Sequence, residues 1–124
     1  MRLLLDTHVA LWSLDGSIEK ATARLIAEAD AVYVSAASLW EIAIKHALGR
    51  IRLSLADLPA SLTASGFREL PVTWRHSIEV RNLPPRHKDP FDRLLVAQAM
   101  SEPLHLLTSD PSLAAYSPLV IIAG

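Results

Sequence analysis

Four of the 13 acidic residues stand where they could act together as ligands of a metal ion. Asp6 and Asp110 each follow a short apolar run, whereas Glu41 and Asp92 each lie in the first turns of an apolar segment with helical spacing. Carboxylates held a few ångströms apart repel, by roughly 4 kcal/mol for a 4 Å pair at an effective dielectric constant near 20. A fold that gathers four of them therefore needs a cation at the same place.

The donor atoms indicate which cation this would be. Carboxylate oxygens favour the hard ions Mg²⁺ or Mn²⁺, and the chain has no cysteine and no paired histidine spacing that would favour zinc. Mg²⁺ keeps several of its waters, so four acids can hold either one ion or two. Two ions about 3.5–4 Å apart would clamp the attacking and leaving oxygens of a phosphodiester.

Each acid also has a purely structural interpretation as part of a helix cap. Asp6 can cap the helix that follows it, Ser38 and Glu41 match a capping box, and Asp89 and Asp110 each precede a proline. Asp89 could also face the same pocket as a fifth carboxylate, although we favour the cap. Capping and metal binding are compatible, because a helix N-terminus helps to keep an acid ionised.

Strand-like and helix-like segments alternate along the chain, which predicts a parallel sheet with helices on both faces. The expected strands are residues 2–6, 31–34, 67–70, 105–108 and 119–122, and the expected helices are residues 18–29, 36–46, 55–65, 73–81 and 90–100. We therefore expect an α/β fold, a three-layer α/β/α sandwich with a central parallel sheet of four to five strands. Such sheets bind ligands beyond the carboxyl ends of their strands, where all four acids fall.

The bulk composition limits the class of protein. The chain has 124 residues, of which 51% are hydrophobic and 20% charged, without an internal repeat or linker, so we expect a single domain over residues 1–124. The first apolar run is too short for a signal peptide, and nothing approaches a membrane span. With no cysteine, these features favour a cytoplasmic protein. The net charge of −1 does not by itself indicate nucleic-acid binding, so any such contact needs a local basic patch.

Four stretches of the chain resemble the PIN-domain family, in particular the VapC toxins of bacterial toxin–antitoxin pairs. They are Leu4-Leu-Asp-Thr-His8, Ser35-Ala-Ala-Ser-Leu-Trp-Glu-Ile-Ala-Ile-Lys45, Asp89-Pro-Phe-Asp-Arg-Leu-Leu-Val-Ala-Gln-Ala99 and Leu106-Leu-Thr-Ser-Asp110. The resemblance covers nearly the whole chain and keeps the four acidic motifs in order. It implies Mg²⁺- or Mn²⁺-dependent cleavage of RNA by an activated water, a homodimer, and neutralisation by a VapB-like antitoxin.

The same resemblance implies roles for single residues. Asp6 and Asp92 would be the central metal ligands, and Glu41 and Asp110 would complete the site directly or through water. The hydroxyl-bearing residues beside these acids could hold ligands or metal-bound waters in place; they are Thr7, Thr108 and Ser109. The alternative for these three residues is ordinary capping and turn formation.

An RNA substrate also needs cations for the phosphates that the metal does not touch. We expect such contacts from Lys45, Arg86, Lys88 and Arg93, whereas Lys45 could instead pair with Glu41, one helical turn away. Other basic residues are expected to be solvated surface; they are Arg50, Arg52 and Arg75. We expect packing roles for five rings, although a base could stack on an exposed tryptophan; they are His8, His105, Trp12, Trp40 and Trp74.

Three other functions are alternatives to a nuclease. Phosphatases similar to haloacid dehalogenases require a second Asp two residues after the nucleophile, but position 8 is His. Response-regulator receivers require an acidic pair after the first strand and a late lysine, whereas the last lysine here is Lys88. A PIN fold that binds RNA or protein without cutting remains the alternative, although the presence of all four acids argues against lost activity.

Overall fold

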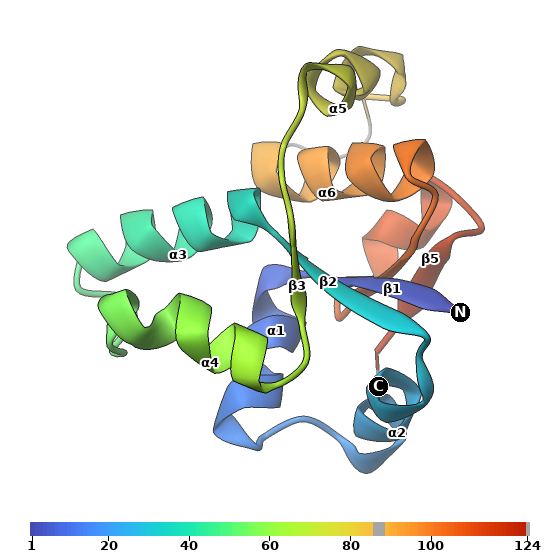
Figure 1. The fold of residues 1–124 in the computed structure, drawn as a ribbon. Helices are drawn as coiled ribbons and strands as arrows, with labels where there is room; N and C mark the ends of the chain where they lie inside the picture. Colours follow the sequence, from blue (N-terminus) through green and yellow to red (C-terminus); the bar gives the residue numbers. More distant parts are fainter. Residues whose placement is uncertain (86–88, 124) are drawn as a thin grey trace.

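The computed structural model describes residues 1–85 and 89–123, and its centre is a parallel sheet in the order β3-β2-β1-β4-β5 (Figure 1). The strands are β1 (Arg2–Leu5), β2 (Ala31–Ser35), β3 (Arg68–Leu70), β4 (His105–Thr108) and β5 (Val120–Ile122). The helices are α1 (Thr7–Asp15), α2 (Lys20–Glu28), α3 (Ala36–Ala47), α4 (Leu58–Ala64), α5 (Trp74–Glu79) and α6 (Pro90–Ser101), with 3₁₀ helices η1 (Leu55–Asp57), η2 (Val80–Asn82) and η3 (Pro111–Ala115). The expected three-layer α/β/α fold with a five-stranded parallel sheet is confirmed.

The apolar run of β1 is buried on both faces of the sheet. Side chains alternate across a strand, so Leu3 and Leu5 join the core that includes residues of α1, α2 and α4, while Leu4 joins the core beneath α6. All three leucines are fully buried, and each contributes about 1.5–3 kcal/mol by leaving water. In Figure 1, α6 and α5 lie on one side of the sheet, and α1, α2 and α4 lie on the other.

The strand order reverses beside β1. The chain runs from β1 outward to β2 and β3, then crosses to β4 on the other side of β1 and continues to β5. The N–H of Asp6 donates to the carbonyl of Leu107, so the carboxyl ends of β1 and β4 lie side by side. Ligands of open α/β sheets bind at such a reversal, and the candidate site lies there.

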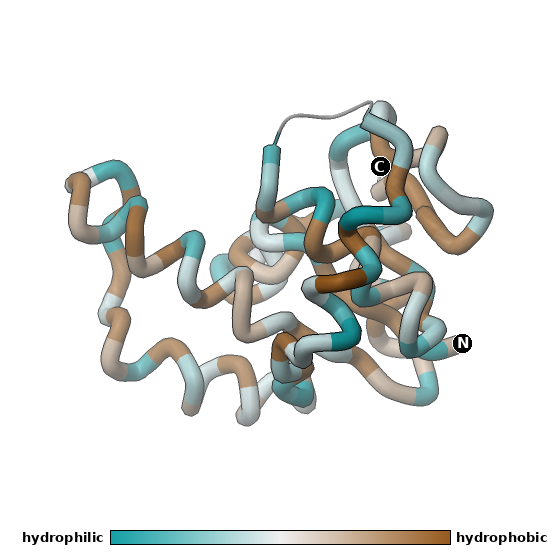
Figure 2. Tube along the Cα trace, turned by 90° about the horizontal axis from the view of Figure 1, so that it is seen from above, coloured by the Kyte–Doolittle hydropathy of each residue, from teal (hydrophilic) through white to brown (hydrophobic). Residues whose placement is uncertain are grey.

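The helices that start at this edge have clear local signals. Asp6 caps α1 by accepting from the N–H of Val9, and Gly16 ends that helix with a φ of 79°. Asp89 caps α6, and Pro90 occupies its first turn, where a missing N–H costs nothing. Figure 2 shows hydrophobic and hydrophilic residues alternating along the helices, as expected for helices with one buried side.

Two expected helices are interrupted. The helix expected over residues 55–65 is divided into η1 and α4, because Pro59 fits only the first turn of an α-helix and so marks where α4 begins. The helix expected over residues 73–81 consists of α5 and then η2. Within the described residues, no helix is both long enough and apolar enough to cross a membrane.

Candidate metal and catalytic site

All four predicted acids line one cavity of about 340 Å³ at the carboxyl edge of the sheet. Its lining consists of Asp6, Thr7, His8, Glu41, Lys45, Asp89, Asp92, Ser109, Asp110 and Pro111. These residues come from the ends of β1 and β4, from the N-terminal parts of α1 and α6, from the middle and last turn of α3, and from the start of η3. The fold therefore brings to one cavity acids that are as much as 104 positions apart in the sequence, Asp6 and Asp110.

Asp6 is held in place by three donors. Its Oδ1 accepts from the N–H of Val9 at 2.8 Å, while its Oδ2 accepts from the hydroxyl of Thr108 at 2.5 Å and the N–H of Ser109 at 3.3 Å. The side chain is only 4% exposed. Three donors to the two carboxylate oxygens fix the orientation of this side chain. Asp6 is both the cap of α1 and part of the wall of the acidic cavity, so its role as a cap does not remove it from the cavity.

Glu41 is buried in the wall of the same cavity. Its Oε1 accepts from the hydroxyl of Thr7 at 2.7 Å, and its Oε2 accepts from Nζ of Lys45 at 2.9 Å. The capping-box interpretation of this residue is wrong, because the cap of α3 is Ser35, whose hydroxyl accepts from the N–H of Ala37. The Glu41 carboxylate is therefore available to the cavity rather than committed to the helix end.

Asp89 and Asp110 combine capping with a place in the cavity wall, and Asp92 lines the cavity from the first turn of α6. Oδ1 of Asp89 accepts from the N–H groups of Phe91 and Asp92 at 2.8 and 3.3 Å, which confirms the cap, and Asp89 also lines the cavity. Oδ1 of Asp110 accepts from the N–H and the hydroxyl of Ser112 at the start of η3. The cavity is thus lined by five carboxylates, one more than we favoured from sequence.

This donor set fits a hard divalent cation. Every anionic group in the cavity wall is a carboxylate, and two of these groups, Asp6 and Glu41, are almost completely buried. Within residues 1–85 and 89–123, no three acidic or histidine side chains are close enough to form a ready-made cluster of direct ligands. Acids distributed around a cavity of this size suit Mg²⁺, which keeps several waters and takes few direct protein ligands.

The three hydroxyl residues differ in what they contact. The hydroxyl of Thr108 donates to Asp6 and accepts from the N–H of Asp110 at 3.1 Å, so it connects two acids of the cavity. Thr7 orients Glu41, while Ser109 contributes its backbone N–H to Asp6. Thr7, at the start of α1, and Thr108, at the end of β4, thus donate to the acids themselves.

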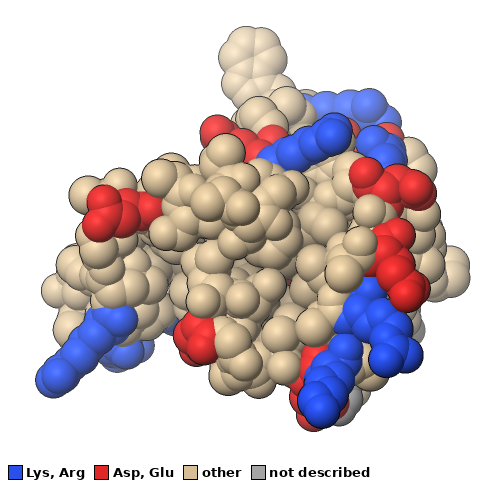
Figure 3. All heavy atoms as spheres, turned by 60° about the horizontal axis from the view of Figure 1, so that its bottom comes forward, with Lys and Arg blue, Asp and Glu red and all other residues tan. Residues whose placement is uncertain are grey.

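The basic side chains predicted to contact RNA phosphates differ in what they contact in the structure. Lys45 pairs with Glu41 at the cavity wall, which is the alternative that the sequence left open. The guanidinium of Arg93 donates to the carbonyls of Pro84 and Val80 and to the Tyr116 hydroxyl, a structural role that leaves it poorly placed for substrate. Arg86 and Lys88 lie outside the described residues. On the face in Figure 3, charged side chains of both signs lie toward the margins, with uncharged surface between them.

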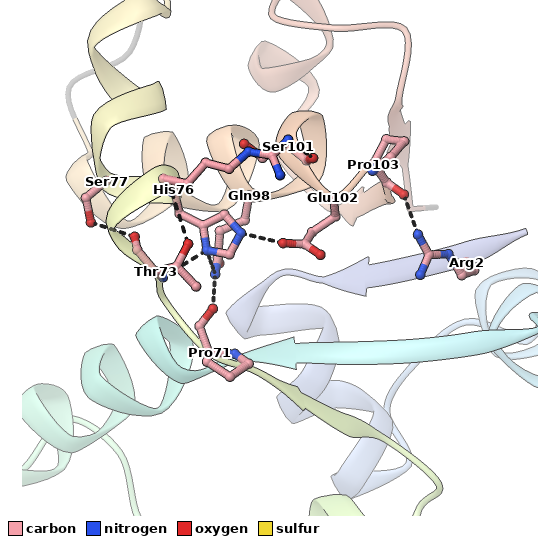
Figure 4. A network of polar contacts seen from close by, with 10 residues as sticks. Arg2, Pro71, Thr73, His76, Ser77, Gln98, Ser101, Glu102 and Pro103 are labelled. Carbon is pink, nitrogen blue, oxygen red and sulfur yellow. Dashed lines mark hydrogen bonds and ion pairs between the residues drawn. The ribbon is translucent and has the colours of Figure 1, made fainter.

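His76 belongs to a buried network between α5 and the end of α6 (Figure 4). Its Nδ1 accepts from the N–H of Thr73 at 3.0 Å and lies 3.3 Å from Nε2 of Gln98, while its Nε2 lies 2.5 Å from Oε2 of Glu102. The hydroxyl of Thr73 accepts in turn from the His76 N–H, forming a capping box. His76 therefore fastens α5 to α6 and is separate from the acidic cavity.

The packing role expected for the tryptophans is wrong. Trp12, Trp40 and Trp74 are 37%, 62% and 90% exposed. His8 is also exposed, and it lines the acidic cavity, with its ring 5.9 Å from that of Trp12. Helical spacing marks these rings as one side of a helix, but it does not show whether another element covers that side. The position of His8 two residues after Asp6 was the available signal for its place in the site.

Comparisons with known proteins agree with this architecture. The family model described as PIN domain matches residues 3–117, and no curated protein matches the chain. A chain in the crystal structure of VapBC2 from Rickettsia felis bound to a promoter DNA fragment superposes with a TM-score of 0.71 and 14% identity, covering 98% of this chain and 97% of that one. A chain in the crystal structure of DNA-bound VapBC from Salmonella typhimurium superposes with a TM-score of 0.71 and 16% identity, covering 98% of this chain and 96% of that one. A chain in the crystal structure of FitAcB from Neisseria gonorrhoeae superposes with a TM-score of 0.65 and 21% identity, covering 96% of each chain.

Proposed function

Because the chain belongs to the PIN-domain family, we propose that it is an endoribonuclease dependent on Mg²⁺ or Mn²⁺ and the toxin of a type II toxin–antitoxin pair. One observation carries the nuclease assignment: two buried carboxylates, Asp6 and Glu41, share a cavity with three further acids where the strand order reverses. Burial of several like charges is unfavourable unless a cation neutralises them. The fold similarity to the VapBC and FitAcB structures supports the toxin assignment.

The proposed site divides the work among its residues. Asp6 and Asp92 would be the central ligands of the cation, and Glu41 and Asp110 would complete the site directly or through water. When bound, the divalent ion would neutralise charge on the scissile phosphate and favour ionisation of the attacking water. The hydroxyls of Thr108 and Thr7 hold Asp6 and Glu41 in fixed orientations.

Lys45 adjusts the charge of this site. Its ammonium group neutralises one of the two buried acids, Glu41. Lys45 also lines the cavity, so it is placed to contact a substrate phosphate when a cation has taken over the neutralisation of the acids. Among the residues that the structure describes, Lys45 is the predicted phosphate contact that we retain.

The proposed partners follow from the same assignment. We propose a cytoplasmic homodimer that cuts RNA and is neutralised by a VapB-like antitoxin. The alternative is a PIN-fold module that binds RNA or protein without cleaving it. The two proposals differ in whether the acidic cavity performs chemistry, so activity of the purified chain decides between them.

The decisive experiment compares two charge-removing variants. Protein freed of any antitoxin should cut RNA with Mg²⁺ or Mn²⁺ and should be inactive in EDTA. Asp6→Asn should abolish cleavage while keeping the fold, because Asn caps a helix as well as Asp. Glu28→Gln, at an exposed position of α2, should cut at the wild-type rate. Equal cleavage by Asp6→Asn and wild type would assign the activity to a contaminant or to another site.

A further inference from the structure

A second hollow, of about 440 Å³, adjoins the acidic cavity and differs from it in chemistry. It is lined by Glu41, Ile44, Lys45, Leu48, Arg50, Asp89, Pro90 and Phe91, and we call it the α3–α6 trough. Glu41, Lys45 and Asp89 line both hollows. Most of the surface that it exposes belongs to apolar atoms. The trough is therefore continuous with the candidate site, but it offers an apolar floor instead of carboxylates.

An exposed aromatic side chain adjoins this trough. Trp40 is 62% exposed, and its ring meets that of Phe91 edge to face at a centroid distance of 5.2 Å. Ile44 and Leu48 follow at four-residue intervals, so they share the side of α3 that carries Trp40; they are 39% and 61% exposed. A stripe of large apolar side chains left in water beside a catalytic cavity marks a binding surface.

The cations of the trough indicate which molecule covers it. Lys45 and Arg50 line it together with the apolar residues. An aromatic and apolar floor beside positive charges matches a nucleotide, whose base stacks on rings while its phosphates contact cations. A base in a duplex is already stacked and cannot lie flat on such a surface, so the surface suits a single strand.

We propose that the α3–α6 trough binds one base of single-stranded RNA, stacked against Trp40 and Phe91, next to the phosphate that is cut. This inference rests on the proposed function, because it places the trough beside the scissile phosphate. Trp40 is a binding residue in this proposal, and Arg50 contacts the neighbouring phosphate. From the sequence we expected a packing role for Trp40, with base stacking as the alternative, and a solvated surface position for Arg50.

The test measures binding apart from cleavage. The anisotropy of a fluorescently labelled single-stranded RNA is followed in EDTA, with wild type, Trp40→Ala, Trp40→Phe and Trp74→Ala. Loss of one stacked base weakens binding about 5- to 100-fold, which is the effect expected for Trp40→Ala. Trp40→Phe keeps a ring and should retain most of the affinity. Trp74 is the matched control, since it is also exposed but lies on α5 and outside the trough.

Two arginine variants supply a second, independent measurement, which is the salt dependence of RNA affinity. Arg50→Gln should reduce the slope of log affinity against log salt concentration by about 0.7, the value for one phosphate contact on a single strand. Arg52→Gln should leave the slope unchanged, because Arg52 is exposed but does not line the trough. This measurement keeps the proposal testable if Trp40→Ala folds poorly, as judged from its melting temperature.

Three results would overturn the proposal. They are equal RNA affinity in Trp40→Ala and Trp74→Ala, equal salt slopes in the two arginine variants, and a fall in molecular mass on light scattering for Trp40→Ala alone. The last result would show that a second copy of the chain covers Trp40. Failure of the nuclease assignment gives a different pattern: RNA binding that depends on Trp40, without cleavage on addition of Mg²⁺.

Discussion

The hydroxyl of Thr108 donates a 2.5 Å hydrogen bond to Oδ2 of Asp6, across 102 positions of sequence. The hydroxyl oxygen of Thr108 also accepts from the N–H of Asp110. One threonine thus fixes the distance between the ends of β1 and β4 and the orientation of the most deeply buried acid in the cavity.

Replacing Thr108 tests this relationship. Thr108→Val keeps the shape of the side chain but removes both hydrogen bonds. Loss of such a supporting contact typically lowers metal affinity 10- to 100-fold, so calorimetric titration with Mn²⁺ should show a loss of this size. Thr108→Ser restores the hydroxyl and should recover most of the affinity. Wild-type affinity in Thr108→Val would show that Asp6 does not need this donor.

A pair of variants separates the two roles of Asp89. Asp89→Asn keeps a side-chain oxygen for the N–H groups of Phe91 and Asp92, so the stability of the protein should change little. Metal affinity should fall, because one negative charge leaves the cavity wall. Asp89→Ala should lose about 1 kcal/mol of stability as well. Urea unfolding and Mn²⁺ titration measure the two effects, and unchanged affinity in Asp89→Asn would limit this residue to capping.

The acidic site was largely predictable because simple rules of sheet architecture fix it. An apolar run such as Leu3–Leu5, buried on both faces, indicates a central parallel strand, and the residue that follows it must lie at the carboxyl edge. The same rule places Asp110 after β4. The order of the strands was not needed to predict that these acids line the same edge of the sheet.

Contacts between side chains and distant backbone were not predictable in this way. Arg93 donates to the carbonyls of Val80 and Pro84, and His76 depends on Gln98 and Glu102 of the neighbouring helix segment. Neither arrangement has a sequence signal, since it depends on how α5 and η2 pack on α6. The exposure of Trp40 was missed for a similar reason: periodicity identifies an apolar side of a helix but not the partner that covers it.

The ion pair between Lys45 and Glu41 predicts opposite effects on two measurements. Lys45→Met removes the positive charge from the cavity wall. Charges about 4 Å apart interact by about 1 kcal/mol even in water, so Mn²⁺ should bind about fivefold more tightly. RNA cleavage at saturating Mn²⁺ should nevertheless become slower, because a phosphate contact is lost. Lys20→Met, on the exposed side of α2, is the control and should change neither quantity; weaker Mn²⁺ binding in Lys45→Met would contradict the assigned role.

His76 should affect stability and not the acidic cavity. His76→Phe fills a similar volume but leaves the N–H of Thr73 without its side-chain acceptor and the Glu102 carboxylate without its partner, while Gln98 keeps the Pro71 carbonyl. Buried donors left without a partner cost about 1–3 kcal/mol each, so the free energy of unfolding in urea should fall by at least that amount. Mn²⁺ affinity measured on the folded variant should stay at the wild-type value. Arg81→Gln, at an exposed position of η2, controls for surface effects, and a matching loss there would point away from the buried network.

Mg²⁺ should stabilise the folded chain, because the cation relieves repulsion among carboxylates that the unfolded chain does not hold together. At a metal concentration 100 times the dissociation constant, binding contributes about 2.7 kcal/mol, which raises the melting temperature of a domain of this size by on the order of 10 °C. Screening by salt also weakens repulsion, so the comparison is made at equal ionic strength, with NaCl replacing MgCl₂. Asp6→Asn should lose most of the shift, whereas Glu28→Gln should keep it. Equal shifts in these two variants would mean that Mg²⁺ acts on the general charge of the protein, and that the acids of the cavity do not bind it as a site.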